Sequence, residues 1–583
     1  MSFTLATQFR DEIKDLKVCA KNGERAKDDL HLEGMARLAL NYLRGNPDPQ
    51  RAYECKFALG PLGIPCHVPI SPPNKHGFDV VSLGDTDSRM DMQFAHMRQI
   101  VGEPIPDPAE SGVRRRVLGY MRKDHLCWLN PGAAIGETID EEWASPWTTA
   151  KLLYSVSEAY QRTGDKACHR MLKKIFKALK DIALWDGKRA YYWGCAPCKQ
   201  GRWLIRKWTI WHSRNYPFIV EPLMRYYECT GDEEGLALAQ SFADGFLDGI
   251  QPEMGAQRVD PANGKFHGHV HLHTHGIWGV AHLGAALGDK RYLDWARKVH
   301  DFVVSIGTDY GWYPENSPQG NRAELCVVGD MASIGAWIAR GGHPQYWDVV
   351  ERTVRNLIRK AQFSLTPEFV RLFEHSNKAK SSREIKAALR SLKAIEGGFV
   401  AQPAFNDWVS YPDNPKLGTP GMYSNGIHMM GCCPPEGMRA LWEAWNGVVE
   451  VKAEGVFINL PISREHAMAR VIAFSPEDGA VEVVAKGPGD FFIRPPSWSE
   501  RAYWKISVNG TEEPVMWGGP AQAYVVRRKA RKGDRLLVSW QALEFTQAMK
   551  PKSMPDGDEI LTIRWTGNKV RAVSPKGKYL PMF

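Results

Sequence analysis

Apolar positions in the first three quarters of the chain recur at helical spacing, in repeated pairs of segments. In the first pair, 149–179, they lie on both sides of a Thr-Gly-Asp turn at 163–165. Glycine stops a helix and aspartate caps the next one, so each unit is predicted to be a helix, a tight turn and a second helix. The same pattern returns at 218–246, 276–304 and, more loosely, 330–357.

These turns are spaced too widely for a short solenoid repeat. Long helix pairs joined by aromatic-rich loops are typical of an α/α toroid, whose loops build a central pocket. We therefore expect a catalytic (α/α)6 toroid, or barrel, over residues 1–447. A stacked helical solenoid is the alternative.

From about Val448 the pattern changes to short apolar runs of the strand type, separated by Gly, Pro and Ser. The run at 506–508 ends in Asn-Gly, a strong signal for a tight hairpin turn. We expect a β-sandwich over 448–583, so the predicted fold class is mainly α and multidomain, with the sandwich following the toroid. Other strand-like runs lie at 449–451, 456–460, 469–474, 481–484 and 536–540.

The composition, 43% hydrophobic and 24% charged residues, is typical of a globular protein. A net charge of +9 is spread along the chain, and no nucleic-acid-binding motif accompanies its short basic runs. Nucleic acid is therefore not an expected partner. No apolar stretch reaches membrane-spanning length, so we expect no membrane partner either.

The N-terminal segment and the cysteines indicate the cellular compartment. Met1 is followed within a few residues by the charged run 10–12, without the apolar core of a signal peptide. The 11 cysteines are odd in number and scattered, which fits reduced thiols better than a disulfide framework. We expect a cytoplasmic protein.

A glutamate and three cysteines stand in two short clusters far apart in the sequence. The first cluster is Glu324-Leu325-Cys326, and the second is Cys432-Cys433. One carboxylate and three thiolates would complete a tetrahedral zinc site, and a thiolate can also act as a nucleophile. Unrelated buried cysteines are the alternative interpretation.

Both clusters are predicted to lie at helix starts. Pro434 and Pro435 suit the first turn of a helix, and an apolar stripe follows them as far as Gly447. Another apolar stripe begins at Met331, shortly after Cys326. A helix N-terminus favours thiolate over thiol, so these positions suit metal binding or nucleophilic chemistry.

These motifs resemble the β-L-arabinofuranosidase-like glycoside hydrolases of families 127 and 146, formerly domain of unknown function 1680. The hallmark of those families is a Glu-x-Cys followed much later by a Cys-Cys. The segment 491–498 resembles the family's Arg-Ile-Pro-Ser-Trp strand, and 508–510, 523–526 and 532–534 follow in the family's order. The resemblance covers 149–543 and implies an α/α barrel followed by a β-sandwich.

The resemblance implies a zinc ion held by Glu324, Cys326, Cys432 and Cys433. It also implies that Cys432 is the nucleophile of a retaining double displacement, unlike the usual scheme with two carboxylates. The thiolate attacks the anomeric carbon, while a carboxylic acid protonates the departing oxygen and later deprotonates the incoming water.

The chain departs from the family pattern at two positions. The acid/base position falls on Thr308, so Asp309 and Glu315 become the catalytic candidates, Asp309 by a one-residue gap and Glu315 by its longer reach. Where the family usually has Asn after the cysteine pair, this chain has Glu436. Glu436 adds a negative charge beside the metal and is a candidate substrate-binding residue.

Histidines alternate perfectly from His267 to His275, so an extended segment would direct all five to one side. They are candidates to bind a second metal or a hydroxyl-rich substrate. The position of the family's pocket histidine selects His269 or His271 for substrate binding. A partly exposed polar loop is the alternative.

Cys195 and Cys198 form a Cys-x-x-Cys among aromatic residues, without a second pair at zinc-finger spacing. Metal binding by this pair is a weak prediction, and its role stays open. The neighbouring aromatics, among them Trp203, Trp208 and Trp211, suit either the walls of a sugar pocket or the packing of inner helices.

The sequence thus predicts a zinc-dependent retaining glycosidase that acts on a small furanoside or an unusual plant-type sugar. The expected partner is a small-molecule carbohydrate. Two alternatives stay open: a toroid sugar isomerase or epimerase with structural zinc, and a non-catalytic sugar-binding relative. The oligomeric state is not determined, with a homodimer as one option.

Overall fold

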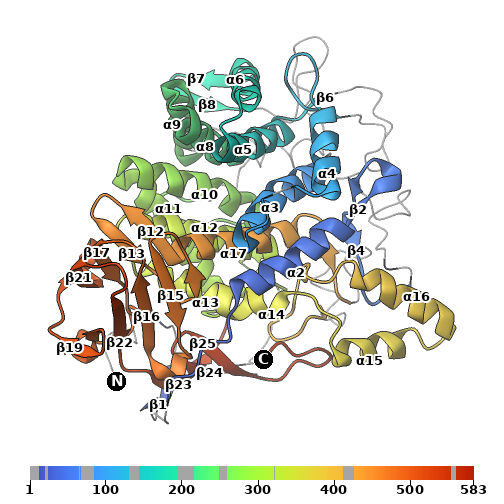
Figure 1. Ribbon diagram of the computed structural model, residues 1–583. Helices are drawn as coiled ribbons and strands as arrows, with labels where there is room; N and C mark the ends of the chain where they lie inside the picture. The colour runs from blue at the N-terminus through green and yellow to red at the C-terminus, as the bar shows by residue number, and fades with distance from the viewer. Residues whose placement is uncertain are drawn as a thin grey trace.

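The computed structural model shows a helical toroid that leads into β-sheets at the C-terminal end of the chain (Figure 1). The predicted fold class, an α/α toroid followed by a β-sandwich, is confirmed. No described helix has both the length and the apolar character needed to cross a membrane. The structure describes residues 9, 12–19, 24–64, 66, 84–104, 106–129, 143–192, 216–248, 259–318, 320, 322–410, 426–552 and 560–583.

Six of the described helices form the inner ring of the toroid. Each packs against the next, and the last packs against the first, so the ring is closed. Outer helices carry the chain back between them, so the ring helices run parallel and their N-terminal ends meet at one mouth. The ring helices are α3 (Asp85–Val101), α5 (Pro146–Thr163), α8 (Val220–Thr230), α10 (Val270–Leu287), α12 (Leu325–Arg340) and α17 (Cys433–Val448).

Outer helix α6 packs against the ring with one apolar stripe. Helix α6 buries Leu172, Ile175, Phe176 and Leu179, while its lysines lie at the surface. Ring helix α12, by contrast, is buried on nearly all sides, as expected for a helix enclosed by others. The outer helices are α2 (Leu32–Gly45), α4 (Pro108–Gly119), α6 (Lys166–Asp181), α9 (Glu233–Asp248), α11 (Lys290–Ile306) and α13 (Tyr346–Thr353).

The Gly-Asp turns have the predicted roles. Gly164 ends α5 with a left-handed φ of 64°, which favours glycine. The Asp165 side chain then accepts a hydrogen bond from the Ala167 backbone N–H at 2.8 Å and caps α6. The turns that follow α8 and α10 repeat the left-handed glycine, at Gly231 and Gly288. Local sequence thus sets where the toroid helices end.

Two antiparallel-rich sheets follow the toroid and share a core. The five-stranded sheet has the order β12-β13-β17-β21-β20, and the six-stranded sheet has the order β14-β15-β16-β22-β18-β19. Ile458 and Ile493 of the first sheet and Val471 and Val483 of the second belong to one buried apolar cluster. The strands are β12 (Val449–Lys452), β13 (Gly455–Ile458), β14 (Arg464–Glu465), β15 (Ala469–Ala473), β16 (Ala480–Ala485), β17 (Gly489–Ile493), β18 (Lys505–Val508), β19 (Thr511–Glu513), β20 (Trp517–Gly518), β21 (Tyr524–Ala530) and β22 (Arg535–Ser539).

A third sheet joins the two ends of the chain. Strand β1 (Glu12–Val18) pairs antiparallel with β23 (Leu543–Met549), and β24 (Leu561–Thr566) and β25 (Lys569–Ser574) complete the sheet (Figure 1). The expected division at 447/448 stays a prediction. Helix α17 ends at Val448 and β12 begins at the next residue, Val449, but β1 adds an N-terminal strand to the C-terminal sheets.

Other described elements are short strands and three α-helices that belong to neither ring of the toroid. Two of the short sheets, β9–β10 and β4–β11, each join segments that are far apart in the chain. These elements are β2 (Pro47–Asp48), β3 (Glu54–Cys55), β4 (Ala58–Leu59), β5 (Trp128–Leu129), β6 (Trp143–Ala144), β7 (Leu184–Asp186), β8 (Arg189–Tyr191), β9 (Gly268–His269), β10 (Asn316–Ser317), β11 (Met429–Met430), α14 (Arg359–Ala361), α15 (Pro367–Ser376) and α16 (Ser382–Lys393).

Candidate metal centre

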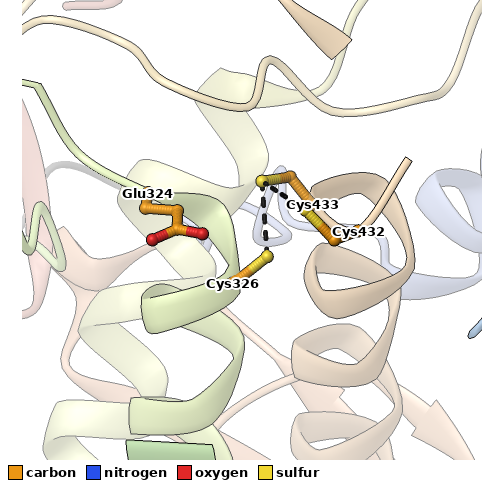
Figure 2. Close-up of side chains that lie close together, drawn as sticks. All are labelled: Glu324, Cys326, Cys432 and Cys433. Atoms are coloured by element: carbon orange, nitrogen blue, oxygen red, sulfur yellow. Dashed lines mark hydrogen bonds between the residues drawn. The ribbon is translucent and has the colours of Figure 1, made fainter. Parts of the chain in front are cut away.

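The two sequence clusters meet where the N-terminal ends of α12 and α17 lie side by side. Glu324 is the residue immediately before α12, and Cys326 lies in its first turn. Cys432 immediately precedes α17, and Cys433 begins it. Figure 2 shows the three sulfur atoms gathered between the two helices, with the Glu324 carboxylate beside them. The predicted placement at helix starts is confirmed.

The four side chains form one compact group. The Sγ atoms of Cys326 and Cys433 lie 3.3 Å apart, and those of Cys432 and Cys433 lie 3.7 Å apart. The potential ligand atoms of all four residues lie within 4.8 Å of one another, so the group could hold a metal ion. Cys326 and Cys433 are 0% and 1% exposed, whereas Cys432 is partly exposed.

The three thiols differ in their electrostatics. Hydrogen bonds from Cys326 and Cys433 hold the pKa of Cys432 well below its usual value, against the effect of burial, and the Arg89 guanidinium adds to this lowering. Burial raises the pKa values of Cys326 and Cys433. The group therefore favours negative charge on Cys432, the sulfur with the most access to solvent.

Arg89 connects this group to the rest of the mouth. It lies on α3, and its Nε pairs with Asp85 at 2.9 Å. Its Nη1 pairs with Glu436, and its Nη2 lies 3.2 Å from Nε2 of His271. Arg89 is buried, and its guanidinium contacts side chains from three ring helices, α3, α10 and α17. It therefore fixes their positions relative to one another.

Glu436, predicted to contact substrate, is held by two arginines. Besides pairing with Arg89, its Oε2 accepts a hydrogen bond from Nε of Arg439 at 2.5 Å. Burial alone would raise the pKa of Glu436, but Arg439 and Arg89 lower it. This carboxylate is therefore ionised, buried and fully engaged with the protein.

His269, another substrate-binding candidate, contacts this Glu-Cys group directly. Its Nε2 lies 2.7 Å from Oε2 of Glu324. Burial opposes its protonation, yet the charges of Glu324 and Glu315 raise the pKa of His269 to about 9. His269 thus orients the Glu324 carboxylate.

The expected extended histidine segment is wrong, because α10 begins at Val270. Within this helix His271 and His275 are one turn apart, and both donate through Nδ1 to Asp330, at 2.7 and 2.9 Å. Nη2 of Arg439 also pairs with Asp330 at 2.6 Å. Burial lowers the pKa values of both histidines well below the usual value. The ligand atoms of His271, His275 and Asp330 lie close enough together to hold a cation. However, Arg439 and Arg89 already supply positive charge at this place.

The two acid/base candidates lie in different surroundings. The backbone carbonyl of Glu315 accepts a hydrogen bond from the Val270 N–H at 2.8 Å, which places Glu315 next to His269. The Glu315 carboxylate pairs with Nε of Arg322 at 2.5 Å. Asp309, by contrast, accepts a hydrogen bond from the Gln547 side chain of β23 at 2.5 Å, so it contacts the third sheet.

Several charged residues of the mouth escaped sequence reasoning. Lys151 of α5 is buried, pairs with Asp85 and lies 3.9 Å above the Trp147 ring. The available signal was in α3, whose first two turns alternate charged and uncharged residues although nearly the whole helix is buried. The other residues missed are Asp85, Arg89, Asp330 and Arg439. Cys195, Cys198 and the tryptophans near them lie outside the described residues.

Neither a protein-family model nor a curated protein matches this sequence. Solved structures do match its fold. The Ara127N-Se structure, a GH127 β-L-arabinofuranosidase from Geobacillus stearothermophilus T6, is 14% identical with a TM-score of 0.61, covering 94% of this chain and 86% of that one. A second GH127 β-arabinofuranosidase is 16% identical with a TM-score of 0.59, covering 92% and 81% of the two chains. A protein described as a glycoside hydrolase is 14% identical with a TM-score of 0.55, covering 83% and 77%. At these identities the likeness establishes a shared fold.

Proposed function

We propose that this chain is a distant β-L-arabinofuranosidase-like glycoside hydrolase that binds zinc and uses Cys432 as its nucleophile. Its substrate class is a small furanoside or an unusual plant-type sugar. The observation that carries this proposal is the convergence of Glu324, Cys326, Cys432 and Cys433 within 4.8 Å at one mouth of the toroid. The fold shared with two GH127 enzymes supports it.

The geometry of the group fits zinc. Tetrahedral zinc with Zn–S bonds of about 2.3 Å places its sulfur ligands roughly 3.8 Å apart. The separations of 3.3 and 3.7 Å lie close to this value, so little movement would be needed. When bound, Zn²⁺ would keep the thiols deprotonated and fix their orientation. Three thiolates and a carboxylate form a donor set that zinc prefers to magnesium or calcium.

Cys432 is the sulfur best placed to attack a substrate. Cys326 and Cys433 are buried, whereas Cys432 is partly exposed and precedes the helix. In the first step its Sγ forms a bond to the anomeric carbon as the glycosidic C–O bond breaks, giving a thioglycosyl enzyme. In the second step a water oxygen displaces Sγ, so the configuration at the anomeric carbon is retained.

Glu315 is the acid/base that we favour. It lies beside His269, which contacts Glu324, whereas Asp309 contacts Gln547 of the third sheet. In its protonated form Glu315 would donate its proton to the departing oxygen. Its carboxylate would then take a proton from the attacking water and return to its starting state. Arg322 would hold this side chain in position.

The isomerase alternative is less well supported. Proton exchange with a sugar needs a histidine that can reach it, but His271 is engaged through both ring nitrogens, with Asp330 and Arg89. His275 is buried as well, and its Nδ1 donates to Asp330. These contacts suit residues that hold the mouth together. The cytoplasmic location and the homodimer stay predictions.

Hydrolysis assays test this proposal. The purified chain should cleave at least one 4-nitrophenyl furanoside from a panel that includes β-L-arabinofuranoside. Cleavage should stop after treatment with 1,10-phenanthroline and return when Zn²⁺ is added. The proposal fails if no glycoside in the panel is cleaved by zinc-loaded protein. It fails equally if cleavage continues in protein shown to be metal-free.

A further inference from the structure

The opposite mouth of the toroid contains a cavity. It has a volume of about 440 Å³ and is lined by residues from the C-terminal halves of α3, α5, α8, α12 and α17. This volume lies within the range of about 300–1,000 Å³ that is usual for small-molecule sites. Along α12, Cys326 and Arg340 are separated by roughly 21 Å, at 1.5 Å per residue. The cavity is therefore distinct from the metal centre.

Two buried polar atoms in the cavity wall have no partner among the described residues. Glu443 is 1% exposed and offers Oε2 to Nη1 of Arg340 at 3.2 Å, but its Oε1 accepts no hydrogen bond. The Trp337 Nε1–H donates none. A buried carboxylate oxygen and a buried indole N–H are costly to leave unpaired. Both residues line the same cavity, and their unpaired acceptor and donor lie just beneath its surface.

The rim of the cavity supplies further donors. Arg162 lies at the C-terminal end of α5 and is exposed. Its Nε donates to the backbone carbonyl of Glu158 at 3.1 Å, and no ion pair is found for its guanidinium within the described part of the chain. Its two terminal nitrogens can therefore donate to a ligand in the cavity. The amide side chains of Gln161 and Asn446 also line the cavity and offer both donors and acceptors.

The charges around the cavity select a neutral ligand. Arg225 is already neutralised by Glu221 at 2.9 Å and Glu228 at 3.4 Å. Arg340 is neutralised by Glu450 at 2.7 Å as well as by Glu443. Of the two groups without a partner, the Glu443 carboxylate oxygen repels anions, and the Arg162 cation at the rim repels cations. The ligand that fits is therefore neutral and carries groups that both donate and accept hydrogen bonds, as hydroxyl groups do.

We propose that this cavity is a second binding site for a neutral, polyhydroxylated small molecule, of the size of a mono- or disaccharide. When the Glu443 and Trp337 side chains turn slightly toward the cavity, one ligand hydroxyl donates to Glu443 and one accepts from Trp337, while others accept from Arg162 at the rim. The site lies at the far end of the ring helices from Cys432. It does not depend on the hydrolase proposal, and it can exist in a protein without hydrolytic activity.

Hydrogen–deuterium exchange of the full zinc-loaded chain tests this proposal, with L-arabinose, maltose and myo-inositol as probes. At least one probe should slow exchange saturably in peptides from the C-terminal halves of α5, α12 and α17. Cys432→Ser should not change this protection, which separates it from binding at the metal centre. The apparent affinity should fall about tenfold in Arg162→Ala and in Trp337→Phe, because each change removes a donor to the ligand.

Arg170→Ala is the matched control, because Arg170 is an exposed arginine on outer helix α6 and does not line the cavity. Its affinity for the probe should equal that of the unmodified chain. Three results would overturn the proposal. They are no saturable protection by any probe, protection confined to the N-terminal halves of the ring helices, and protection unchanged in both Arg162→Ala and Trp337→Phe. Arg162→Ala keeps the test decisive if Trp337→Phe fails to fold.

Discussion

The Sγ atoms of Cys326 and Cys433 lie 3.3 Å apart, although 107 residues separate them in the sequence. The contact forms because α12 and α17 are neighbours in the ring and present their N-terminal ends at the same mouth. A closed ring of parallel helices thus gathers first-turn residues from distant segments. The proposed metal centre, and the charged side chains around it, follow from this geometry.

Metal content should depend on the buried thiols. The purified chain should hold about one zinc ion per molecule by elemental analysis. Cys433→Ser should lose most of this zinc and unfold at a lower temperature, because a bound metal stabilises only the folded state. Cys229→Ser, which changes a thiol that lies on α8 away from the group, should keep its zinc. Full zinc occupancy in Cys433→Ser would contradict the proposed ligand set.

Glu315 and Asp309 should behave differently when neutralised. Glu315→Gln should lower kcat by about 10²–10⁴-fold on substrates with poor leaving groups, as expected when a general acid/base is removed. Added azide, which needs no base, should restore part of the rate on an activated aryl glycoside. Asp309→Asn should lower the melting temperature through its contact with Gln547 and change kcat little. The reverse pattern would transfer the acid/base role to Asp309.

Arg89 should act as a positioning residue. Arg89→Lys keeps the charge but loses the planar guanidinium that contacts Asp85, Glu436 and His271 at once. We expect kcat/KM to fall by about 10–100-fold, as is usual for residues that orient metal ligands or nucleophiles. The pH–rate profile should shift as well, a change that a purely structural role would not produce.

Arg114→Lys is the matched control, since Arg114 forms a partly buried pair with Asp91 on the outer side of α3. It should leave kcat/KM and the pH profile unchanged. If Arg89→Lys and Arg114→Lys have equal effects, the contacts that Arg89 makes beside the proposed metal centre have no special role in catalysis.

His282 should make thermal stability depend on pH. Burial would lower its pKa, but Glu221 and Glu228, at 2.9 Å on either side, raise it above the usual value of about 6.5, with Arg225 and the stacked Trp337 ring close by. A raised folded-state pKa gives stability that is complete below the unfolded pKa and is lost as pH rises through the folded pKa.

The melting temperature of the unmodified chain should therefore exceed that of His282→Gln most clearly at pH 6. This difference should shrink as the pH rises above about 6.5. His375→Gln, which changes an exposed histidine in the last turn of α15, should show no such trend. A difference between unmodified chain and His282→Gln that grows with pH would contradict the assigned charge state.

The helix pairs were predictable because their signals are local. Each Gly-Asp turn contains both the helix stop and the next cap, so Gly164 and Asp165 act without help from distant residues. The histidine segment was not predictable in this way. Its alternation matches the period of a strand, but closure of the ring makes α10 a helix from Val270 onwards.

The partners of the site could be predicted only in part. Glu324 and the three cysteines carry a recognisable motif, whereas Arg89 and Lys151 carry none. Their roles arise because α3 packs against both α5 and α17, a contact that spans most of the chain. Strand β1 is a similar case, because it pairs with β23 more than five hundred residues later. Such long-range contacts leave no local pattern.

Mass spectrometry of the chain during turnover tests the central claim, that Cys432 forms a covalent bond to the sugar. In Glu315→Gln an activated aryl β-L-arabinofuranoside should still glycosylate the enzyme, but hydrolysis of the product should be slow, so the adduct should accumulate. We expect intact masses raised by one pentosyl group, located by peptide mapping at Cys432, and no adduct when Cys432→Ser is added. Turnover of the same substrate by Cys432→Ser at the unmodified rate, or an adduct on another residue, would contradict the account.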